Sequence, residues 1–352
     1  MAAEESARAV YFVSPGRVEA RTIPLKPPRN SVGVSSRLCG VSHGTEGLFF
    51  RGEAPRNAPG ETLSALRGEL SYPVKYGYMN VGVTDAGERV FAFYPHQDRF
   101  YLPPEELKPL PDTLSFEDAV LLPTVETAVG IVHDLGPYLG EVILVTGLGM
   151  VGLLTAALLR RMSLTVFAMD PRPVRRAAAA KLGCVVPGGG SDGSGGSDGS
   201  GAVGGPRGGP GDGGDDPRRE LRRRVGLDAF DAAVNTSGAT EALQYCLDTV
   251  AMDGTVIEAS WYGERPVSLG LGGNFHRGRV HLRSAQVSHL NPVLSSRWSR
   301  ERRFRLAMDA AHDLNPGQYI SHRFGLGQVQ AAFDMIERGT DDVLQVVLDP
   351  ER

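Results

Sequence analysis

Cysteine is scarce and scattered in this 352-residue chain, which has only three: Cys39, Cys184 and Cys246. No two of them form a Cys-x-x-Cys pair, so neither a disulfide framework nor a closed four-cysteine zinc site can be built from them. We interpret the three side chains as reduced thiols that are mostly structural.

The chain also lacks an excess of positive charge and a long apolar run. Its formal net charge is −4, which does not favour a polyanionic partner, and the short basic cluster at 218–224 is interpreted as a solvated helix start. No run approaches the roughly 18 apolar residues of a membrane span, and residues 1–8 are polar, without an apolar signal core. We therefore expect a cytoplasmic protein that binds neither nucleic acid nor membrane.

What the chain does have is a glycine fingerprint at the end of an apolar strand, in the run VILVTGLGMVG at 142–152. Gly147 suits a tight turn, Gly149 lets backbone amides approach a pyrophosphate, and Gly152 lets a helix pack closely on the strand. The pyrophosphate would lie at the helix N-terminus. The pattern predicts a dinucleotide site made by Gly147, Leu148, Gly149, Met150, Val151 and Gly152.

A second apolar strand, at 164–169, ends in Asp170, about 20 residues beyond the fingerprint. An acidic side chain there accepts hydrogen bonds from ribose hydroxyls and repels a 2′-phosphate, so NAD(H) is favoured over NADP(H). Arg172, Arg175 and Arg176 leave NADP(H) open, and we include Arg175 among the cofactor contacts. The alternative is a glycine turn in another α/β protein, with Asp170 capping the next helix.

Length and pattern together predict two domains. Residues 1–122 hold short β-like runs between proline and glycine turns, which is typical of a β-rich domain. Residues 123–291 alternate strands with helices, as in a parallel sheet, and residues 292–352 are expected to complete the first domain. The glycine-rich segment 187–217 buries too little apolar surface to fold, so we predict a disordered loop there rather than a phosphate cradle.

With these parts in this order, the chain resembles the medium-chain dehydrogenase/reductase superfamily of alcohol-dehydrogenase-like enzymes. The resemblance covers nearly the whole chain and rests on residues 40–46, 77–82, 87–91, 147–152, 231–238 and 254. It implies an α/β fold in which a GroES-like β-rich catalytic domain accompanies a Rossmann domain with a doubly wound parallel sheet. The Gly-Thr-Glu version of the first motif is similar to a branch that includes bacteriochlorophyllide dehydrogenase, as a likeness of motif only.

Zinc-dependent members of that superfamily carry a cysteine ligand in the first motif, and a histidine followed by a glutamate in the second. The matching positions here are Ser42, Tyr78 and Met79. Serine is a poor zinc ligand, and neither a phenol nor a thioether replaces imidazole and carboxylate. Cys39 and His43 lie close in sequence but do not supply the roughly three ligands that a catalytic zinc needs. We therefore predict no metal site.

Without zinc, a protein group must polarise the carbonyl or take the hydroxyl proton. Thr45 lies within a residue of the proton-relaying hydroxyl of zinc-type relatives, and the resemblance places Tyr78 at a former ligand position near the nicotinamide, although Tyr78 could equally fill the β-domain core. His43 is a third candidate because imidazole titrates near neutral pH. Glu126 lies near the family's third ligand position, where it is a proton acceptor, a polar anchor or simply a first-turn helix residue.

Further candidates follow from strand ends and loops. Asn235 and Thr236 end an apolar strand at the carboxyl edge of the sheet, where ligands bind in open α/β folds, and Ser260 ends the next strand. We add these three to the cofactor candidates. His96, in a Tyr-Pro-His-Gln turn after a strand, could line the substrate mouth, but it is interpreted as a plain loop residue. The loop 272–276 resembles one near the subunit contact of dimeric relatives, which is consistent with a homodimer.

The predicted function is a zinc-independent, NAD(H)-dependent oxidoreductase that interconverts an alcohol and a carbonyl on a small molecule by hydride transfer. One alternative is an NADPH-dependent enoyl or quinone reductase of the same superfamily, against which Asp170 argues. Another is a non-catalytic nucleotide-binding sensor or scaffold. Substrate and direction stay open, because fold alone does not fix chemistry.

Overall fold

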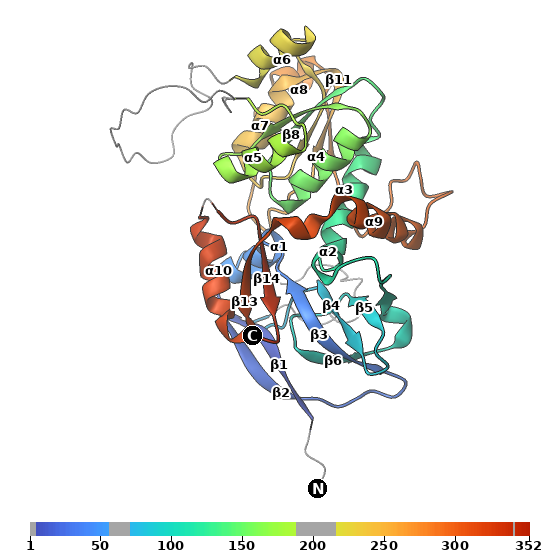
Figure 1. Cartoon of the computed structure of the whole chain (residues 1–352). Coiled ribbons are helices and arrows are strands. Elements are labelled where there is room, and N and C mark those ends of the chain that lie inside the picture. Colours follow the sequence, from blue (N-terminus) through green and yellow to red (C-terminus); the bar gives the residue numbers. More distant parts are fainter. Residues whose placement is uncertain (1–4, 56–70, 188–215, 341) are drawn as a thin grey trace, which may run out of the picture. The chain divides into compact units, whose positions relative to one another are not determined.

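The computed structural model describes residues 5–55, 71–187, 216–340 and 342–352 (Figure 1). Contacts divide the chain into two compact units. The first comprises residues 1–134, 260–267 and 285–352, and the second comprises residues 135–259 and 268–284. The first break therefore falls at the end of a helix rather than at residue 122, where the sequence places it. Most of the predicted glycine-rich loop lies outside the described residues.

The first unit is built on an antiparallel hairpin and a seven-stranded sheet. The hairpin pairs β1 (Ser6–Ser14) with β2 (Arg17–Pro24). The sheet has the order β13-β14-β3-β4-β5-β7, with β6 also paired to β3. Its strands are β3 (Val32–Gly40), β4 (Asn80–Thr84), β5 (Arg89–Ala92), β6 (Arg99–Leu102), β7 (Lys108–Pro109), β13 (Ile320–Gly325) and β14 (Gln345–Asp349). Because β14 pairs with β3, the last strand of the chain completes the sheet of the first unit.

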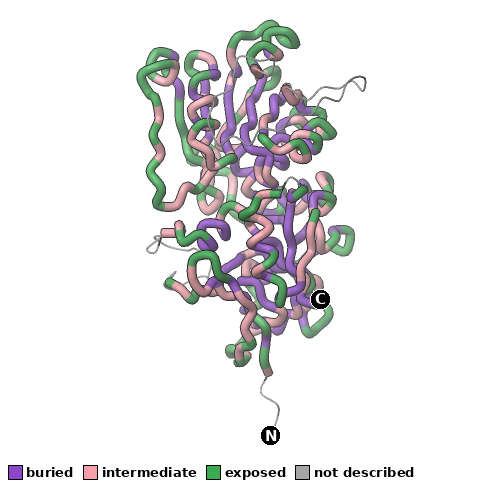
Figure 2. Tube along the Cα trace, turned by 90° about the vertical axis from the view of Figure 1, so that its left-hand side faces the viewer, coloured by how far each residue is buried: buried purple, intermediate pink, exposed green. Residues whose placement is uncertain are grey.

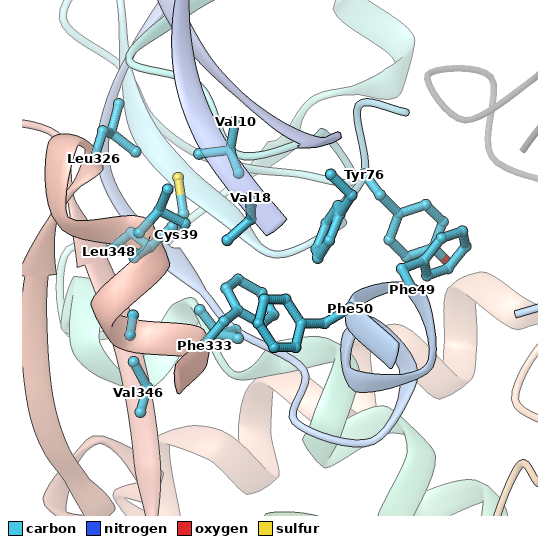
Figure 3. Packing of buried hydrophobic residues seen from close by; sticks show 14 of the residues in the cluster. Val10, Val18, Cys39, Phe49, Phe50, Tyr76, Leu326, Phe333, Val346 and Leu348 are labelled. Carbon is cyan, nitrogen blue, oxygen red and sulfur yellow. The ribbon is translucent and has the colours of Figure 1, made fainter. Parts of the chain in front are cut away.

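Aromatic rings fill the core between this unit's strands and two of its helices, α1 (Thr45–Arg51) and α10 (Val329–Arg338). Phe50 stacks on Phe333 with ring centroids 5.4 Å apart, and Phe12 meets Phe333 edge-on at 5.1 Å. Cys39 and the surrounding aliphatic side chains belong to the same buried cluster (Figure 3). Such contacts between distant segments hold the unit together mainly by burying apolar surface.

Three more helices belong mainly to the first unit: α2 (Phe116–Ala119), α3 (Leu122–Leu135) and α9 (Arg300–Leu314). The sequence sets their ends. Ser299 caps α9 by accepting a hydrogen bond from the Arg302 backbone N–H at 3.0 Å, which satisfies an otherwise unpaired donor of the first turn. Gly339 ends α10 with a φ of +63°, a left-handed conformation that favours glycine.

The second unit has one five-stranded sheet of order β12-β11-β10-β8-β9, and every neighbouring pair is parallel. Its strands are β8 (Val142–Thr146), β9 (Thr165–Met169), β10 (Phe230–Asn235), β11 (Val250–Glu258) and β12 (His281–Ser284). Its helices are α4 (Met150–Arg161), α5 (Pro173–Lys181), α6 (Pro217–Val225), α7 (Thr240–Thr249) and α8 (Asn274–Arg277).

Every residue of β8 is buried, as expected for a central parallel strand covered on both faces. Most residues of the central strands β8 and β10 are buried, whereas every residue of β12, at the edge of the sheet, is exposed (Figure 2). The predicted α/β fold class, a β-rich domain together with a parallel-sheet Rossmann domain, is confirmed. In the described part of the chain, no helix is both long enough and apolar enough to cross a membrane.

Candidate cofactor and active site

The glycine fingerprint forms the turn between β8 and α4. Gly147 has a φ of +83°, and a Cβ added to it would lie 2.6 Å from the backbone of Ser237. A Cβ added to Gly152 would lie 1.9 Å from the carbonyl oxygen of Gly147. No side chain fits at either position, so both glycines are required for the turn and for the close packing of α4 on its strand.

Gly149 has different surroundings, because a Cβ added there would meet nothing within 4 Å. It stands at the N-cap of α4, a helix of 12 residues. Free backbone N–H groups and the helix dipole make such an end favourable for an anion. Leu148 and Met150 on either side are buried, and Val151 is half-buried. The turn therefore presents backbone rather than side chain to a ligand, which fits a dinucleotide pyrophosphate.

Asp170 follows β9 directly, and only 2% of its side chain is exposed. Its Oδ2 accepts a hydrogen bond from the Leu148 backbone N–H at 2.7 Å, and its Oδ1 accepts one from the Arg172 backbone N–H at 2.9 Å. Arg175 Nη1 lies 3.4 Å from Oδ2. Burial lowers the pKa of Arg175, against the opposing effect of Asp170. The carboxylate is thus tied both to the fingerprint turn and to the start of α5.

Asn235, at the end of β10, is fully buried and joins three strand ends. Its Oδ1 accepts a hydrogen bond from Thr146 Oγ1 at 2.8 Å, and its Nδ2 donates to Glu258 Oε2 at 2.6 Å. Thr236 Oγ1 donates to the carbonyl of Gly147 at 2.7 Å. Both residues therefore support the fingerprint turn through their side chains, and their contact with a cofactor stays a prediction.

Thr45 and Tyr78 both belong to the first unit, and both are half-buried. Thr45 is the first residue of α1. The Tyr78 ring stands edge-on to Tyr76, with centroids 6.3 Å apart, and Tyr76 stacks on Phe49 at 3.9 Å. Tyr78 thus lies at the margin of the core, which agrees with either interpretation of it, as a reactive phenol or as a packing residue. Ser260 is also half-buried and belongs to this unit.

His43 is held against β14. Its Nε2 lies 3.2 Å from the backbone nitrogen of Val346, which donates a hydrogen bond to it. A ring nitrogen that accepts such a bond carries no proton. Any proton that His43 exchanged would have to pass through its other ring nitrogen, and its role as a proton shuttle stays a prediction.

Glu126 forms a buried ion pair with Arg303, which links α3 to α9. Arg303 Nε donates to Glu126 Oε1 at 3.0 Å, and the side chains are 3% and 9% exposed. The same guanidinium donates to the carbonyls of His289, at 2.9 Å, and Val287. Burial raises the pKa of Glu126, and the charge of Arg303 opposes that rise. Of the three roles considered for Glu126, these contacts agree best with that of a polar anchor.

The interpretation of His96 as a plain loop residue is wrong, because its side chain is fully buried. Its Nε2 lies 2.7 Å from Glu46 Oε2, and neither side chain is exposed at all. Burial by itself would lower the pKa of His96, but Glu46 and Cys39 outweigh it and raise that pKa to about 10. Sequence reasoning missed this pair because 50 positions separate its members, and no local pattern marks them as partners.

The positions that match zinc ligands in relatives do not fit that metal. Met79 is buried, and its sulfur accepts a hydrogen bond from Thr124 Oγ1 at 3.7 Å. Ser42 and Tyr78 offer only hydroxyl groups, which bind zinc poorly while they keep their protons. Within the described residues, no three His, Cys, Asp or Glu side chains are grouped so that they could hold a metal ion.

Comparison with known proteins gives the following relatives, although no family model matches the chain. The chain is 24% identical over 307 residues to D-guloside 3-dehydrogenase of Escherichia coli K12, covering 78% of this chain and 79% of that protein. It superposes on an alcohol dehydrogenase (rspB) of E. coli CFT073, solved with NADH, with a TM-score of 0.72 and 14% identity, over 98% and 99% of the two chains.

A putative zinc-binding dehydrogenase of Sinorhizobium meliloti 1021, bound to NADP, superposes with a TM-score of 0.70 and 18% identity, over 99% of this chain and 100% of that one. The fold is thus that of the alcohol-dehydrogenase-like oxidoreductases. The shared fold extends over nearly the whole chain, and both of these structural neighbours hold a nicotinamide cofactor.

Proposed function

We propose that this protein is a zinc-independent, NAD(H)-dependent oxidoreductase that interconverts an alcohol and a carbonyl on a small molecule. The observation that carries the proposal is the buried carboxylate of Asp170, hydrogen-bonded to the Leu148 N–H in the fingerprint turn. The backbone around Gly149 and the N-terminus of α4 would hold the pyrophosphate, and Asp170 the adenosine ribose. A bound nicotinamide supplies hydride chemistry.

The preference for NAD(H) follows from the hydrogen-bonding capacity of Asp170. An ionised carboxylate offers about four lone-pair sites, and Leu148, Arg172 and Arg175 donate to it here. The remaining capacity suits a ribose hydroxyl, which donates, whereas a 2′-phosphate only accepts and is repelled by the carboxylate. Arg175 offsets part of that repulsion, which is why discrimination rather than exclusion of NADP(H) is expected.

Proton transfer would fall to the hydroxyl groups of Thr45 and Tyr78. In the oxidative direction, the substrate hydroxyl passes its proton to one of these oxygens, which releases its own proton to water, while the carbon that bears the hydroxyl loses hydride; reduction reverses these transfers. Either hydroxyl can donate to a carbonyl oxygen and so polarise it. Glu126 serves as an anchor in this scheme, because its carboxylate is already committed to Arg303.

D-guloside 3-dehydrogenase, a relative that shares 24% identity with this chain, supports a secondary alcohol on a sugar or polyol as the substrate. NAD⁺ reduction with a panel of glycosides, polyols and simple diols tests this directly. We expect turnover with the polyhydroxylated compounds. Turnover only with enones or quinones, and with NADPH, would replace the proposal with the reductase alternative.

Substitution of the hydroxyl groups tests the proposed proton donors. Tyr78→Phe and Thr45→Val each remove one oxygen and keep nearly the same shape, so NADH affinity should be unchanged. At least one of them should lower kcat by about 100-fold or more, the usual range for a lost acid or base. Full activity of both variants would mean that other groups transfer the proton.

A further inference from the structure

The buried pair of Glu46 and His96 connects segments far apart in the sequence. Glu46 is the second residue of α1, and His96 lies between β5 and β6. The His96 Nε2 to Glu46 Oε2 distance is 2.7 Å, and both side chains are wholly inaccessible. The backbone carbonyl of His96 accepts a hydrogen bond from Val10 N–H at 2.9 Å. The backbone at His96 is thus tied to β1.

Each partner of the pair borders one of the proposed proton donors. Glu46 follows Thr45 directly, and its second carboxylate oxygen accepts the Ser42 N–H at 2.9 Å. On the other side, a Cβ added to Gly77 would lie 2.8 Å from His96 Nε2, so the backbone just before Tyr78 packs closely against the imidazole. The φ of Gly77 is +120°, which few other residues adopt. The imidazole of His96 therefore packs against both the segment that carries Thr45 and the segment that carries Tyr78.

Stability alone does not explain such a pair. Burying two charges costs several kcal/mol each, and apolar replacements for buried ion pairs are often neutral or stabilising. His96 Nδ1 makes no hydrogen bond of normal geometry, and the Cys39 thiol that interacts with the ring is only a weak partner, which adds a further cost. Unlike an apolar contact, an ion pair fixes the direction and the distance between its two groups.

We propose that His96 is a positioning residue: with Glu46, it fixes the backbone segments that carry Thr45 and Tyr78 for proton transfer. This inference rests on the proposed function, which assigns the proton transfer to those two hydroxyl groups. His96 itself touches no substrate in this scheme, because its side chain is fully buried. Its effect is on geometry, where a displacement of about 1 Å costs roughly 100-fold in rate.

The groups that face His96 are consistent with a charged imidazole. Glu46 and Cys39 together keep the pKa of His96 well above neutral, although burial opposes them. Asn80, on β4, places its Nδ2 3.4 Å from Cys39 Sγ and so also contacts the thiol. The charge on the ring strengthens its hydrogen bond to Glu46 and makes the brace stiffer than a neutral pair.

The test compares His96→Gln and Glu46→Gln with Asp118→Asn, using the full chain. Asp118 is also buried in the first unit, where its Oδ1 accepts the Gly317 N–H at 2.8 Å, but it contacts neither Thr45 nor Tyr78. Amide hydrogen exchange is measured over residues 42–51 and 76–79, NADH binding by fluorescence, and kcat and KM with the best substrate of the panel.

We expect His96→Gln to speed exchange in both segments and to lower kcat by about 10- to 100-fold, with NADH affinity unchanged. Glu46→Gln keeps a hydrogen-bonding group and should recover part of that loss. Asp118→Asn should lose stability without losing kcat. If kcat or the exchange of the two segments is unaffected in folded His96→Gln, the inference is overturned. If the wild type binds no NADH, the proposed function fails, and the exchange data still decide whether the brace exists.

Discussion

The backbone N–H of Leu148 donates to Asp170 Oδ2 over 2.7 Å, so the residue that follows β9 is fastened to the turn that follows β8. This one bond couples the two elements that the proposed function assigns to the dinucleotide, the turn to its pyrophosphate and the carboxylate to its ribose. It also means that substitutions at Asp170 act on the shape of the turn as well as on the ligand.

Replacing two of the fingerprint glycines with alanine should have opposite outcomes. Gly152→Ala places a Cβ 1.9 Å from the carbonyl oxygen of Gly147, so we expect it to lower the free energy of unfolding by about 1–3 kcal/mol or more. Gly149→Ala meets no atom of the protein within 4 Å and should fold normally while it weakens NADH binding. Urea unfolding and NADH titration of both variants measure the contrast. Normal NADH affinity in folded Gly149→Ala would mean that the pyrophosphate lies elsewhere.

Asp170→Asn should change cofactor preference. The amide keeps an acceptor for one of the two backbone N–H donors, but it removes the charge that repels a 2′-phosphate. We expect NADH affinity to fall by about 10-fold, the equivalent of roughly 1.4 kcal/mol, while NADPH affinity rises relative to it. The matched control is Asp228→Asn, because that exposed carboxylate pairs with Arg222 on the surface. A ratio of affinities equal to that of the wild type contradicts the assignment of Asp170.

Glu126 and Arg303 can be tested as an anchor rather than as catalytic groups. Breaking the pair with Arg303→Met leaves a buried carboxylate, and we expect a loss of about 3–5 kcal/mol in the free energy of unfolding. The double variant with Glu126→Gln should regain part of that stability and keep substantial kcat. Unfolding in urea and steady-state kinetics give both quantities. A stable double variant that lacks turnover would indicate that Glu126 is a proton acceptor rather than an anchor.

The pH dependence of stability reports on His96. Its folded pKa, about 10, lies above the ordinary histidine pKa of about 6.5, so its stabilising contribution is complete below that ordinary value and disappears as pH rises through about 10. The free energy of unfolding of the wild type should therefore fall more steeply with rising pH over this interval than that of Glu46→Gln. Urea unfolding at several pH values in this interval gives both slopes. Parallel slopes would show that the imidazole is not held in its charged form.

The sequence was sufficient for features that depend on neighbouring residues. Gly147, Gly149 and Gly152 lie within one turn and its helix, so their spacing predicts the strand–turn–helix, and the place of the ligand stays a prediction. Asp170 was predicted because the length of a helix fixes how far along the chain the next strand ends. The overall fold follows from the same local periodicity, taken together with the motifs of the β-rich part.

Features formed by residues far apart in the sequence could not be predicted from it. The partners of the Glu46–His96 pair lie 50 positions apart, and those of the Glu126–Arg303 pair lie 177 apart. A histidine in a proline-containing turn usually faces solvent, and only the tertiary fold shows that the ring of His96 is enclosed by Gly77 and Glu46. Burial of this kind is set by packing between elements, which no local pattern encodes.

The most direct test of the central claim is a fluorescence titration of the purified protein with NADH and, separately, with NADPH at matched salt and pH. We predict that NADH binds at least about 10-fold more tightly than NADPH, because the Asp170 carboxylate accepts a ribose hydroxyl and repels a 2′-phosphate. Tighter binding of NADPH would contradict that assignment and favour the reductase alternative. Binding of neither cofactor would contradict the proposed enzymatic function as a whole.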